Sequence, residues 1–354
     1  MVCITLAACC PDGPGVAAHS STRRTDLDAA FHQDPRWLGG DGAYTIDLAD
    51  GRVLWLFGDS FIATSDAHVR TEATMVRNSV AVMDGADLAT AAMTFAWRDS
   101  SVPASFFPEA GDHWFWPADG VRVPGGSLTI FLNEQMATPG QGLGFAAAGY
   151  RAMRVVDPSG PPATWTLEPV ATVPAPQDPS ASIACSAVDG DHLVALVTDS
   201  DAHHGRLARW PLDAADLTAP EWWDGDRWRA QSALTRPPAI VIDDGASECS
   251  LHLDGGHWLY IASQGFGATT IVVRDALSIE GPWSAPGTIF TPPESSAPDA
   301  FVYAGKAHPM LTGKGLLITY ADNSFTFGDL LDPARAATLY WPHVAEVVLD
   351  FLLC

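Results

Sequence analysis

The sequence predicts an all-β protein, and within that class a five-bladed β-propeller. The first observation is a repeat with five copies, each made of a strand, a turn rich in Gly and Asp, a strongly apolar strand and a terminal polar residue. The copies recur roughly every 60 to 75 residues, a period that suits four-stranded blades with long loops. The second observation is that helical periodicity is nearly absent, with one short helical turn expected over residues 330–337.

The five copies share this pattern and end in a carboxylate or an amide. They are Asp41-Gly-Ala-Tyr44 with Val53-Leu-Trp-Leu-Phe-Gly-Asp59, Asp119-Gly-Val-Arg122 with Leu128-Thr-Ile-Phe-Leu-Asn-Glu134, Cys185-Ser-Ala-Val188 with Leu193-Val-Ala-Leu-Val-Thr-Asp199, Glu248-Cys-Ser-Leu251 with Trp258-Leu-Tyr-Ile-Ala-Ser-Gln264, and Lys306-Ala-His-Pro309 with Leu316-Leu-Ile-Thr-Tyr-Ala-Asp-Asn323.

The copies divide the chain into blades. We expect them at about residues 37–99, 113–174, 182–230, 246–290 and 303–349, joined by Pro-rich linkers in which no ladder N–H is needed. The final strand, over residues 339–349, completes the last blade or closes the ring onto the first. A six-bladed ring would need a further copy within 135–180 or 200–245, and neither segment contains one.

Composition favours one large soluble domain. The chain has 354 residues, of which 47% are hydrophobic and 17% charged, so a full core can form. We assign residues 31–354 to a single propeller and expect a monomer. The net charge of −23 argues against nucleic acid and anionic membranes as partners, and solubility alone explains it. No apolar run reaches the length of a transmembrane helix.

The first 30 residues have the character of a truncated signal or lipoprotein tether. Leu6-Ala-Ala-Cys9 is similar to a bacterial lipobox, in which Cys9 would carry the lipid, but a basic n-region is missing and the apolar segment is short. We therefore expect a secreted or lipid-anchored extracellular protein. Cys185 and Cys249 occupy equivalent positions in neighbouring blades, where a disulfide and two buried thiols are both compatible with the sequence. No Cys/His spacing typical of zinc is present.

The repeat also predicts where polar residues gather. In a propeller the first strand of each blade lines the central channel and the second runs back antiparallel, so the start of one and the end of the other meet at one face. Two rings of polar residues are expected at that mouth. The first contains Asp41, Asp119, Glu248 and Lys306 or His308, and the second contains Asp59, Glu134, Asp199, Gln264 and Asn323.

The first blade carries the sharpest feature. Asp41 and Asp59 are symmetric about a turn at Ala49-Asp50-Gly51, which places them roughly opposite each other across a hairpin. Opposed side chains have Cβ atoms about 4.5–5.5 Å apart, and two carboxylates at that distance should raise one pKa. Three explanations fit such an arrangement. The two carboxylates are catalytic, they bind a cation, or the positive charge of Arg77 or Lys306 lies between them. Glycoside hydrolysis needs two carboxyl groups flanking the scissile bond.

Other residues complete the candidate site. Glu248, across the channel, is a candidate proton donor, or it binds a sugar hydroxyl or Arg77. Arg77 and Asn78 enter the third strand, where Arg77 is placed to keep Asp59 ionised or to bind a hydroxyl. His308 orients a carboxylate or touches substrate, unless its role is structural. Substrate-binding positions are assigned to Arg77, Asn78, Trp116, Asp119, Glu134, Lys306, His308 and Asn323, with Trp116 as a stacking platform unless it only packs between blades.

These motifs resemble those of a known family. Gly39-Gly-Asp41-Gly, Trp55-Leu-Phe-Gly-Asp59-Ser-Phe, Arg77-Asn-Ser, Glu248-Cys-Ser, Gly281-Pro-Trp-Ser and Tyr303-Ala-Gly-Lys306-Ala-His308-Pro look like the propeller domain of glycoside hydrolase family 183, formerly a domain of unknown function, which contains endo-acting D-arabinanases. Families 43 and 117 share the five-bladed plan and the inner-strand Asp. The resemblance covers about residues 35–349 and implies Asp41 and Asp59 as the catalytic pair, with Glu248 as a third catalytic residue.

The resulting hypothesis is a glycoside hydrolase that cuts furanosidic polysaccharide, with α-D-arabinan of arabinogalactan or lipoarabinomannan as substrate. One Asp acts as general base or nucleophile and a second acid donates the proton. The chemistry needs no cofactor and no catalytic metal, although a structural Ca²⁺ or Na⁺ fits a propeller channel. The alternatives are a non-catalytic carbohydrate-binding propeller and a cell-surface interaction scaffold.

Overall fold

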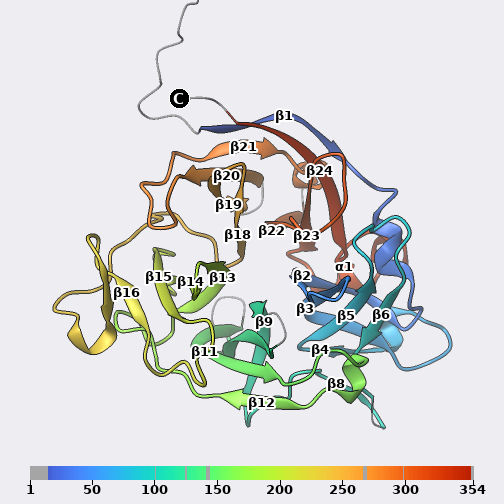
Figure 1. The fold of residues 1–354 in the computed structure, drawn as a ribbon. Coiled ribbons are helices and arrows are strands. Elements are labelled where there is room, and N and C mark those ends of the chain that lie inside the picture. The colour runs from blue at the N-terminus through green and yellow to red at the C-terminus, as the bar shows by residue number, and fades with distance from the viewer. Residues whose placement is uncertain are drawn as a thin grey trace, which may run out of the picture.

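Five β-sheets stand around a central channel like the blades of a fan (Figure 1). The computed structural model describes residues 15–99, 101–123, 126–140, 144–265, 269–297 and 299–351. Within these residues the predicted five-bladed all-β propeller is confirmed, and each expected copy of the repeat supplies the two innermost strands of one blade.

The strands of each blade follow one another from the channel outwards. Blade one contains β2 (Trp37–Asp47), β3 (Arg52–Ala63), β5 (Ser79–Asp84) and β6 (Met93–Ala96), with β4 (Ala73–Val76) also paired to β3. Blade two contains β9 (His113–Arg122), β10 (Leu128–Ala137), β11 (Phe145–Val155) and β12 (Leu167–Val170). Blade three contains β13 (Ser182–Asp189), β14 (His192–Thr198), β15 (Gly205–Pro211), β16 (Glu221–Trp223) and β17 (Trp228–Ala230). Blade four contains β18 (Cys249–Asp254), β19 (His257–Gln264), β20 (Thr270–Ala276) and β21 (Gly287–Phe290).

Blade five is closed by the two ends of the described chain. From the channel outwards it contains β22 (Ala300–Ala307), β23 (Leu316–Ser324), β24 (Pro342–Phe351) and β1 (Val16–Arg23), so β1 is its outermost strand (Figure 1). The expected boundary at residue 30 is therefore wrong: residues 16–23 belong to the propeller. The expected final strand is the third strand of its own blade. Cys9 lies outside the described residues.

Short elements connect the blades. Two helices, α1 (Phe327–Leu331) and α2 (Pro333–Ala336), lie between β23 and β24, close to the expected helical turn. The strands β7 (Arg98–Asp99) and β8 (Pro103–Ala104) form a small separate ribbon, and the 3₁₀ turns are η1 (Asp28–His32), η2 (Arg70–Glu72), η3 (Pro162–Thr164), η4 (Gln231–Ala233) and η5 (Pro293–Ser296). None of the helices described is long and apolar enough to cross a membrane.

The core lies between blades, which explains why the strands are apolar on both faces. Successive side chains of a strand point to opposite faces. On β3, Leu54 and Leu56 pack toward blade two, while Trp55 and Phe57 pack toward blade five, and all four are fully buried. Similar clusters of buried side chains join the other neighbouring blades. The ring is therefore held together by side-chain packing rather than by backbone hydrogen-bond ladders between blades.

Two thiols face each other between blades three and four. Cys185 on β13 and Cys249 on β18 are fully buried and free, with their Sγ atoms 2.9 Å apart. We predict that mild oxidation by a small disulfide reagent forms a bridge between them, releasing two protons and two electrons to the reagent. Peptide mapping after alkylation should show the peptides of Cys185 and Cys249 joined with a loss of two hydrogens, and a Cys185→Ser variant should lack this species. Alkylation of both Cys185 and Cys249 in the unfolded protein after oxidation would contradict the prediction.

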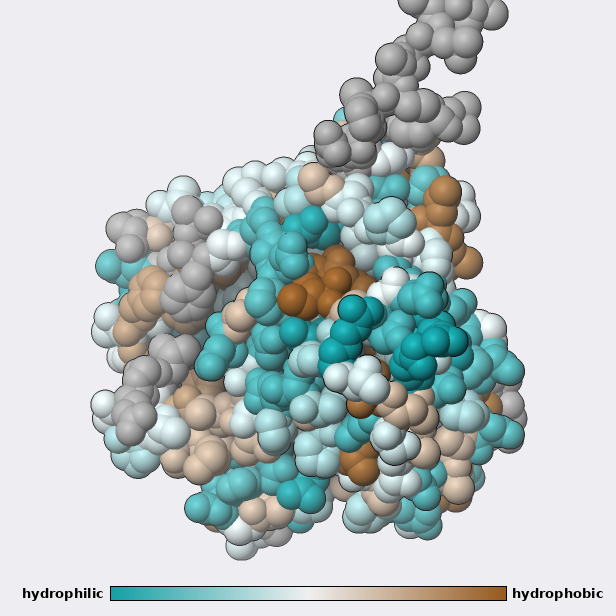
Figure 2. Space-filling model, turned by 90° about the vertical axis from the view of Figure 1, so that its left-hand side faces the viewer, coloured by the Kyte–Doolittle hydropathy of each residue, from teal (hydrophilic) through white to brown (hydrophobic). Residues whose placement is uncertain are grey.

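The outer surface is mostly hydrophilic, as Figure 2 shows for the side of the ring that carries β16. The large apolar side chains that stay exposed include Leu277 beside β20, and Phe325 and Phe327 beside α1. Because β23 runs toward the mouth and ends at Ser324, Phe325 and Phe327 lie at the mouth, whereas Leu277 follows the opposite end of β20.

Candidate active site

An irregular hairpin brings Asp41 and Asp59 together. Gly40 on β2 pairs with Ser60 on β3, and Gly42 pairs with Phe57, so Gly58 and Asp59 form a bulge on β3 opposite Asp41. Gly58 is required there, because a Cβ atom at this position would overlap Oδ1 of Asp41. Bulges of this kind are common next to functional sites, where they change the direction of a side chain.

Two tyrosine hydroxyls hold the Asp41 carboxyl group. The Tyr303 hydroxyl on β22 donates to Oδ2 at 2.7 Å, and the Tyr340 hydroxyl donates to the same oxygen at 3.0 Å. Burial, and then the charges of Asp59 and Glu248, raise the pKa of Asp41 to about 7, although the two hydrogen bonds lower it. Asp41 is therefore suited to carry a proton near neutral pH.

Asp59 has a more strongly polar environment. The pKa of Asp59 is raised, because the effect of burial exceeds that of the Arg77 guanidinium and the Trp116 indole N–H, which lower it. Arg77 Nη1 lies 3.2 Å from Oδ2, and Trp116 Nε1 donates to Oδ1 at 2.9 Å. Both oxygens of Asp59 thus face donors that favour the ionised form, in contrast to Asp41, whose donors are neutral phenols. The contact between the Arg77 guanidinium and the Asp59 carboxylate that the sequence predicted is therefore present.

Glu248 approaches the pair from blade four and is held by a buried lysine. Lys306 Nζ lies 2.8 Å from Glu248 Oε2, and it also donates to the carbonyl oxygens of Gly42 and Ala304. The Lys306 side chain is 1% exposed and its ammonium group lies 4.2 Å from the centre of the Tyr44 ring. Lys306 therefore lies beneath the mouth and orients Glu248, and it does not reach the surface.

Two further residues expected at the mouth lie elsewhere. Asp119 is deeper in the channel, where the backbone N–H groups of Gly120 and Ser186 donate to it and burial raises its pKa to about 7. His308 follows the far end of β22, with both ring nitrogens 2.7 Å from the hydroxyls of Thr45 and Thr319. Their place in the first ring was wrong because the inner strands begin earlier than the repeat suggests: β9 begins at His113 and β22 at Ala300, so Asp119 lies well inside its strand and His308 beyond the end of its strand.

The remaining predicted residues divide into core and mouth. Asn78 is fully buried and its amide bonds the backbone of Phe107 and Phe115, so it joins blades one and two and does not face the mouth. Glu134 is at the mouth of blade two but accepts hydrogen bonds from Arg151 and His113. Asn323 lies 3.4 Å from the Tyr303 hydroxyl, next to the acid pair.

Tyr340 is a residue of the candidate site that the sequence analysis did not predict. It lies just before β24, and its backbone adopts a positive φ of 66°, a conformation that points its hydroxyl at Asp41. Arg70, which is buried beside the Tyr340 ring, fixes this segment by donating to backbone carbonyls of Leu38 and Leu330. No local sequence signal predicts that a tyrosine near the chain end reaches the first blade.

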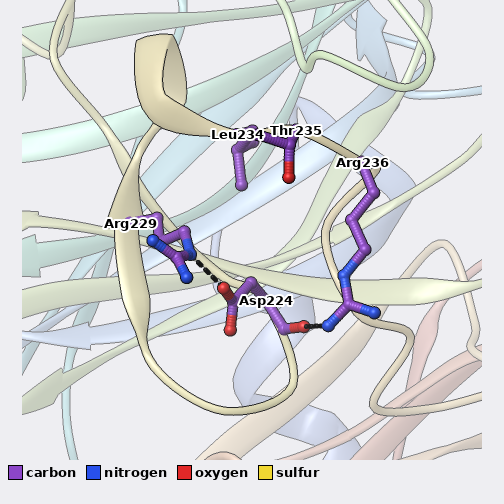
Figure 3. Close-up of a pocket in the computed structure, with 5 residues that line it drawn as sticks. All are labelled: Asp224, Arg229, Leu234, Thr235 and Arg236. Atoms are coloured by element: carbon purple, nitrogen blue, oxygen red, sulfur yellow. Dashed lines mark hydrogen bonds and ion pairs between the residues drawn. The ribbon is translucent and has the colours of Figure 1, made fainter.

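Two cavities among the described residues lie away from the acid pair. One, of about 330 Å³, lies in the loops of blade three, where Arg229 pairs with the Asp224 carboxylate and Arg236 donates to its carbonyl (Figure 3). The other, of about 310 Å³, is the far end of the channel and includes Asp119 and Lys306. The carboxylates instead lie at the open mouth, where the Asp59 and Glu248 side chains are 14% and 27% exposed.

Metal ligands are not grouped in the described part of the chain. No cluster of three or more His, Cys, Asp or Glu side chains there is arranged to hold an ion.

Stability should depend on the protonation of Asp41. Its pKa is about 7 in the folded protein, against 3.8 for an unperturbed carboxyl, so the folded state holds a proton that the unfolded state releases. The stabilisation is complete below about pH 4 and is lost as pH rises toward 7, at about 1.4 kcal/mol for each unit. We predict that the melting temperature of Asp41→Asn, relative to the parent, rises between pH 4 and 7. The exposed control Asp84→Asn should show a constant difference, and a flat difference for Asp41→Asn would contradict the prediction.

Comparisons with known proteins agree on the fold. A family model described as "Domain of unknown function (DUF5005)" matches residues 24–348. A crystal structure of a protein from Bacteroides ovatus ATCC 8483, provisionally described as a hydrolase, superposes with a TM-score of 0.73 at 16% identity and covers 92% of this chain and 90% of that one. A comparison with curated proteins finds none that matches this chain.

Two further structures are more distant. The GH43 protein BlXynB of Bacillus licheniformis gives a TM-score of 0.46 at 12% identity, with 94% of this chain and 54% of that chain covered. The α-L-arabinofuranosidase PaAbf62A of Podospora anserina, solved with cellotriose, gives 0.48 at 13% identity, with 91% and 94% covered. At these levels of similarity, function has to be inferred from the site itself.

Proposed function

The chain belongs to the DUF5005 family, and on that premise we propose that it is a glycoside hydrolase whose active site is the mouth of the propeller around Asp41 and Asp59. The proposed substrate is a furanosidic polysaccharide, α-D-arabinan of arabinogalactan or lipoarabinomannan, as the motif resemblance implies. The export and lipid anchor expected from residues 1–30 are part of the same proposal, since such a polymer lies outside the cell.

One observation carries the proposal: the carboxyl groups that meet at the mouth have different hydrogen-bond partners, neutral hydroxyls for Asp41 and charged groups for Asp59 and Glu248. Asp41 is bonded by neutral hydroxyls and has a raised pKa, Asp59 is paired with a guanidinium, and Glu248 is paired with an ammonium. Titratable groups whose environments differ in this way are typical of acid and base pairs in enzymes. A purely structural pair would gain nothing from keeping one carboxyl protonated beside an ionised one.

The environments assign a role to each group. Asp41 donates its proton to the glycosidic oxygen as the bond to the leaving sugar breaks. Asp59, which faces Arg77, acts in its ionised form: it removes a proton from water or attacks the anomeric carbon as nucleophile. Glu248, paired with Lys306, stabilises the positive charge that develops on the sugar ring. The proposed proton donor is thus Asp41 rather than Glu248, which the sequence offered as a candidate for this role.

A reducing-end assay tests the proposal. Purified arabinogalactan is the substrate, with xylan and L-arabinan as controls, at a pH below and a pH above 7. We expect new reducing ends from arabinogalactan only, with activity falling above pH 7 as Asp41 loses its proton. Cleavage of xylan or L-arabinan instead would change the substrate but keep the reaction. Binding of arabinogalactan without cleavage would favour the carbohydrate-binding alternative.

A further inference from the structure

We propose that the cavity in the loops of blade three binds a tetrahedral oxyanion, a phosphate or a sulfate group, between Arg229 and Arg236 (Figure 3). This site is separate from the acid pair and does not depend on the proposed hydrolysis. The cavity has a volume of about 330 Å³ and is lined by Asp224, Arg229, Leu234, Thr235 and Arg236. Asp224 follows β16, Arg229 lies on β17, and the other three residues follow the turn η4.

The segment that forms the cavity is rich in cations, although the chain as a whole is strongly acidic. Three of the 19 Lys and Arg residues of the chain, Arg227, Arg229 and Arg236, lie within residues 227–236, which contain no Asp or Glu. The whole chain has a net charge of −23. Because anions are attracted to a local excess of positive charge, this segment can bind an anion that the rest of the chain repels.

The one carboxylate in the lining is already compensated by its own partners. Oδ1 of Asp224 accepts hydrogen bonds from the backbone N–H groups of Asp226 at 3.0 Å and Arg227 at 2.9 Å, and Oδ2 accepts one from Arg229 Nε. The N–H of Arg227, and then the guanidinium of Arg229, lower the pKa of Asp224 to about 2. Asp224 therefore holds Arg229 in place, and two guanidinium groups against one carboxylate leave the lining with a net positive charge.

The two guanidinium groups keep donors that the described structure does not use. Arg229 bonds Asp224 through Nε, and Arg236 donates to the Asp224 carbonyl oxygen through Nη2 at 2.8 Å. The described residues supply no hydrogen bond to the Nη groups of Arg229, to Nε and Nη1 of Arg236, or to the Thr235 hydroxyl.

The arrangement of these donors favours a tetrahedral group. Figure 3 shows Arg229 and Arg236 on opposite sides of the cavity and Thr235 along a third side. A phosphate or a sulfate has oxygens in all these directions, and guanidinium groups bind such oxygens in pairs. The two oxygens of a carboxylate lie in one plane and cannot meet all three donors equally well.

The backbone holds the cavity in shape. The N–H of Ala239 donates to the Trp223 carbonyl oxygen at 2.8 Å and that of Gln231 to the Pro220 carbonyl oxygen at 3.0 Å, so the loop around η4 is fastened to both ends of β16. A preorganised site loses less conformational entropy when a ligand binds. Small-molecule sites have volumes of about 300–1,000 Å³, so this cavity has room for an ester as well as for a free ion.

Isothermal titration calorimetry of the full chain at low ionic strength tests the site. The probes are inorganic phosphate, inorganic sulfate, a hexose phosphate and acetate. We expect one-to-one binding of phosphate and sulfate, and binding of acetate that is at least ~10-fold weaker. Arg236→Met should weaken phosphate binding at least ~10-fold and Thr235→Val at least ~3-fold, since each removes a donor. Arg227→Met, at an exposed residue outside the lining, is the matched control and should change the affinity less than about two-fold.

The probes also distinguish the source of the oxyanion. Hexose phosphate that binds more tightly than inorganic phosphate, and loses affinity in the same variants, would identify an ester on a sugar, whereas equal or weaker binding would identify the free ion. Thr235→Val keeps the test decisive if Arg236→Met disturbs the loop, because the Thr235 hydroxyl has no partner among the described residues. The inference is overturned by a lack of saturable binding of all three tetrahedral probes, by acetate binding as tight as that of phosphate, by unchanged affinity in both variants, or by an equal loss in Arg227→Met.

Discussion

Replacing Asp41 or Asp59 by Asn should lower kcat at least ~10²-fold, because each change removes a proton donor or a base while preserving shape. In Asp41→Asn the amide still meets the hydroxyls of Tyr303 and Tyr340 but cannot protonate the leaving oxygen. In Asp59→Asn the charge facing Arg77 is lost. Both proteins should fold, since removing one of two neighbouring carboxylates relieves repulsion.

Initial rates and melting curves of the same preparations check this expectation. Asp84→Asn, an exposed change on blade one, is the matched control and should retain parental activity. Parental rates in both Asn variants, on a substrate that the parent cleaves, would refute the catalytic assignment. Lost activity together with a lowered melting temperature would instead favour a cation site formed by the two carboxylates.

Replacing Lys306 by Met should have the largest effect on stability. The Met side chain fills similar space but leaves the carbonyls of Gly42 and Ala304 without this donor, and leaves Glu248 without its counter-ion. Breaking a buried pair by removing one partner costs about 3–5 kcal/mol, and the partial exposure of Glu248 places our expectation near the lower value. The free energy of unfolding in urea measures this loss.

A double variant separates charge from packing. Glu248→Gln/Lys306→Met removes both charges and should recover part of the lost stability, while activity stays low because the carboxylate is absent. Lys314→Met, at an exposed lysine near the start of β23, is the control and should change stability little. A Lys306→Met protein as stable as the parent would show that the ammonium group is not a structural centre of the mouth.

Sequence patterns predicted the mouth best in the hairpin of blade one, whose two strands are adjacent in the chain. Asp41 and Asp59 belong to one copy of the repeat, and symmetry about the turn at residues 49–51 is enough to set them near each other. Asp119 and His308 were placed by alignment between copies, but β9 begins at His113 and β22 at Ala300, so Asp119 lies inside its strand and His308 beyond the end of its strand. A repeat in the sequence does not specify where each inner strand begins, because this depends on how the strand pairs and packs against its neighbours.

By itself the sequence determined the number of blades, the apolar strands and the acidic hairpin, since period and alternation are local properties of the chain. The tertiary structure alone decided which groups surround each carboxylate. Tyr340 reaches Asp41 from 299 positions away in the sequence, and β1 closes the ring beside β24 rather than acting as a tether. Contacts of this kind arise only when the ring closes, and they give Asp41 and Asp59, two residues of identical type, different hydrogen-bond partners.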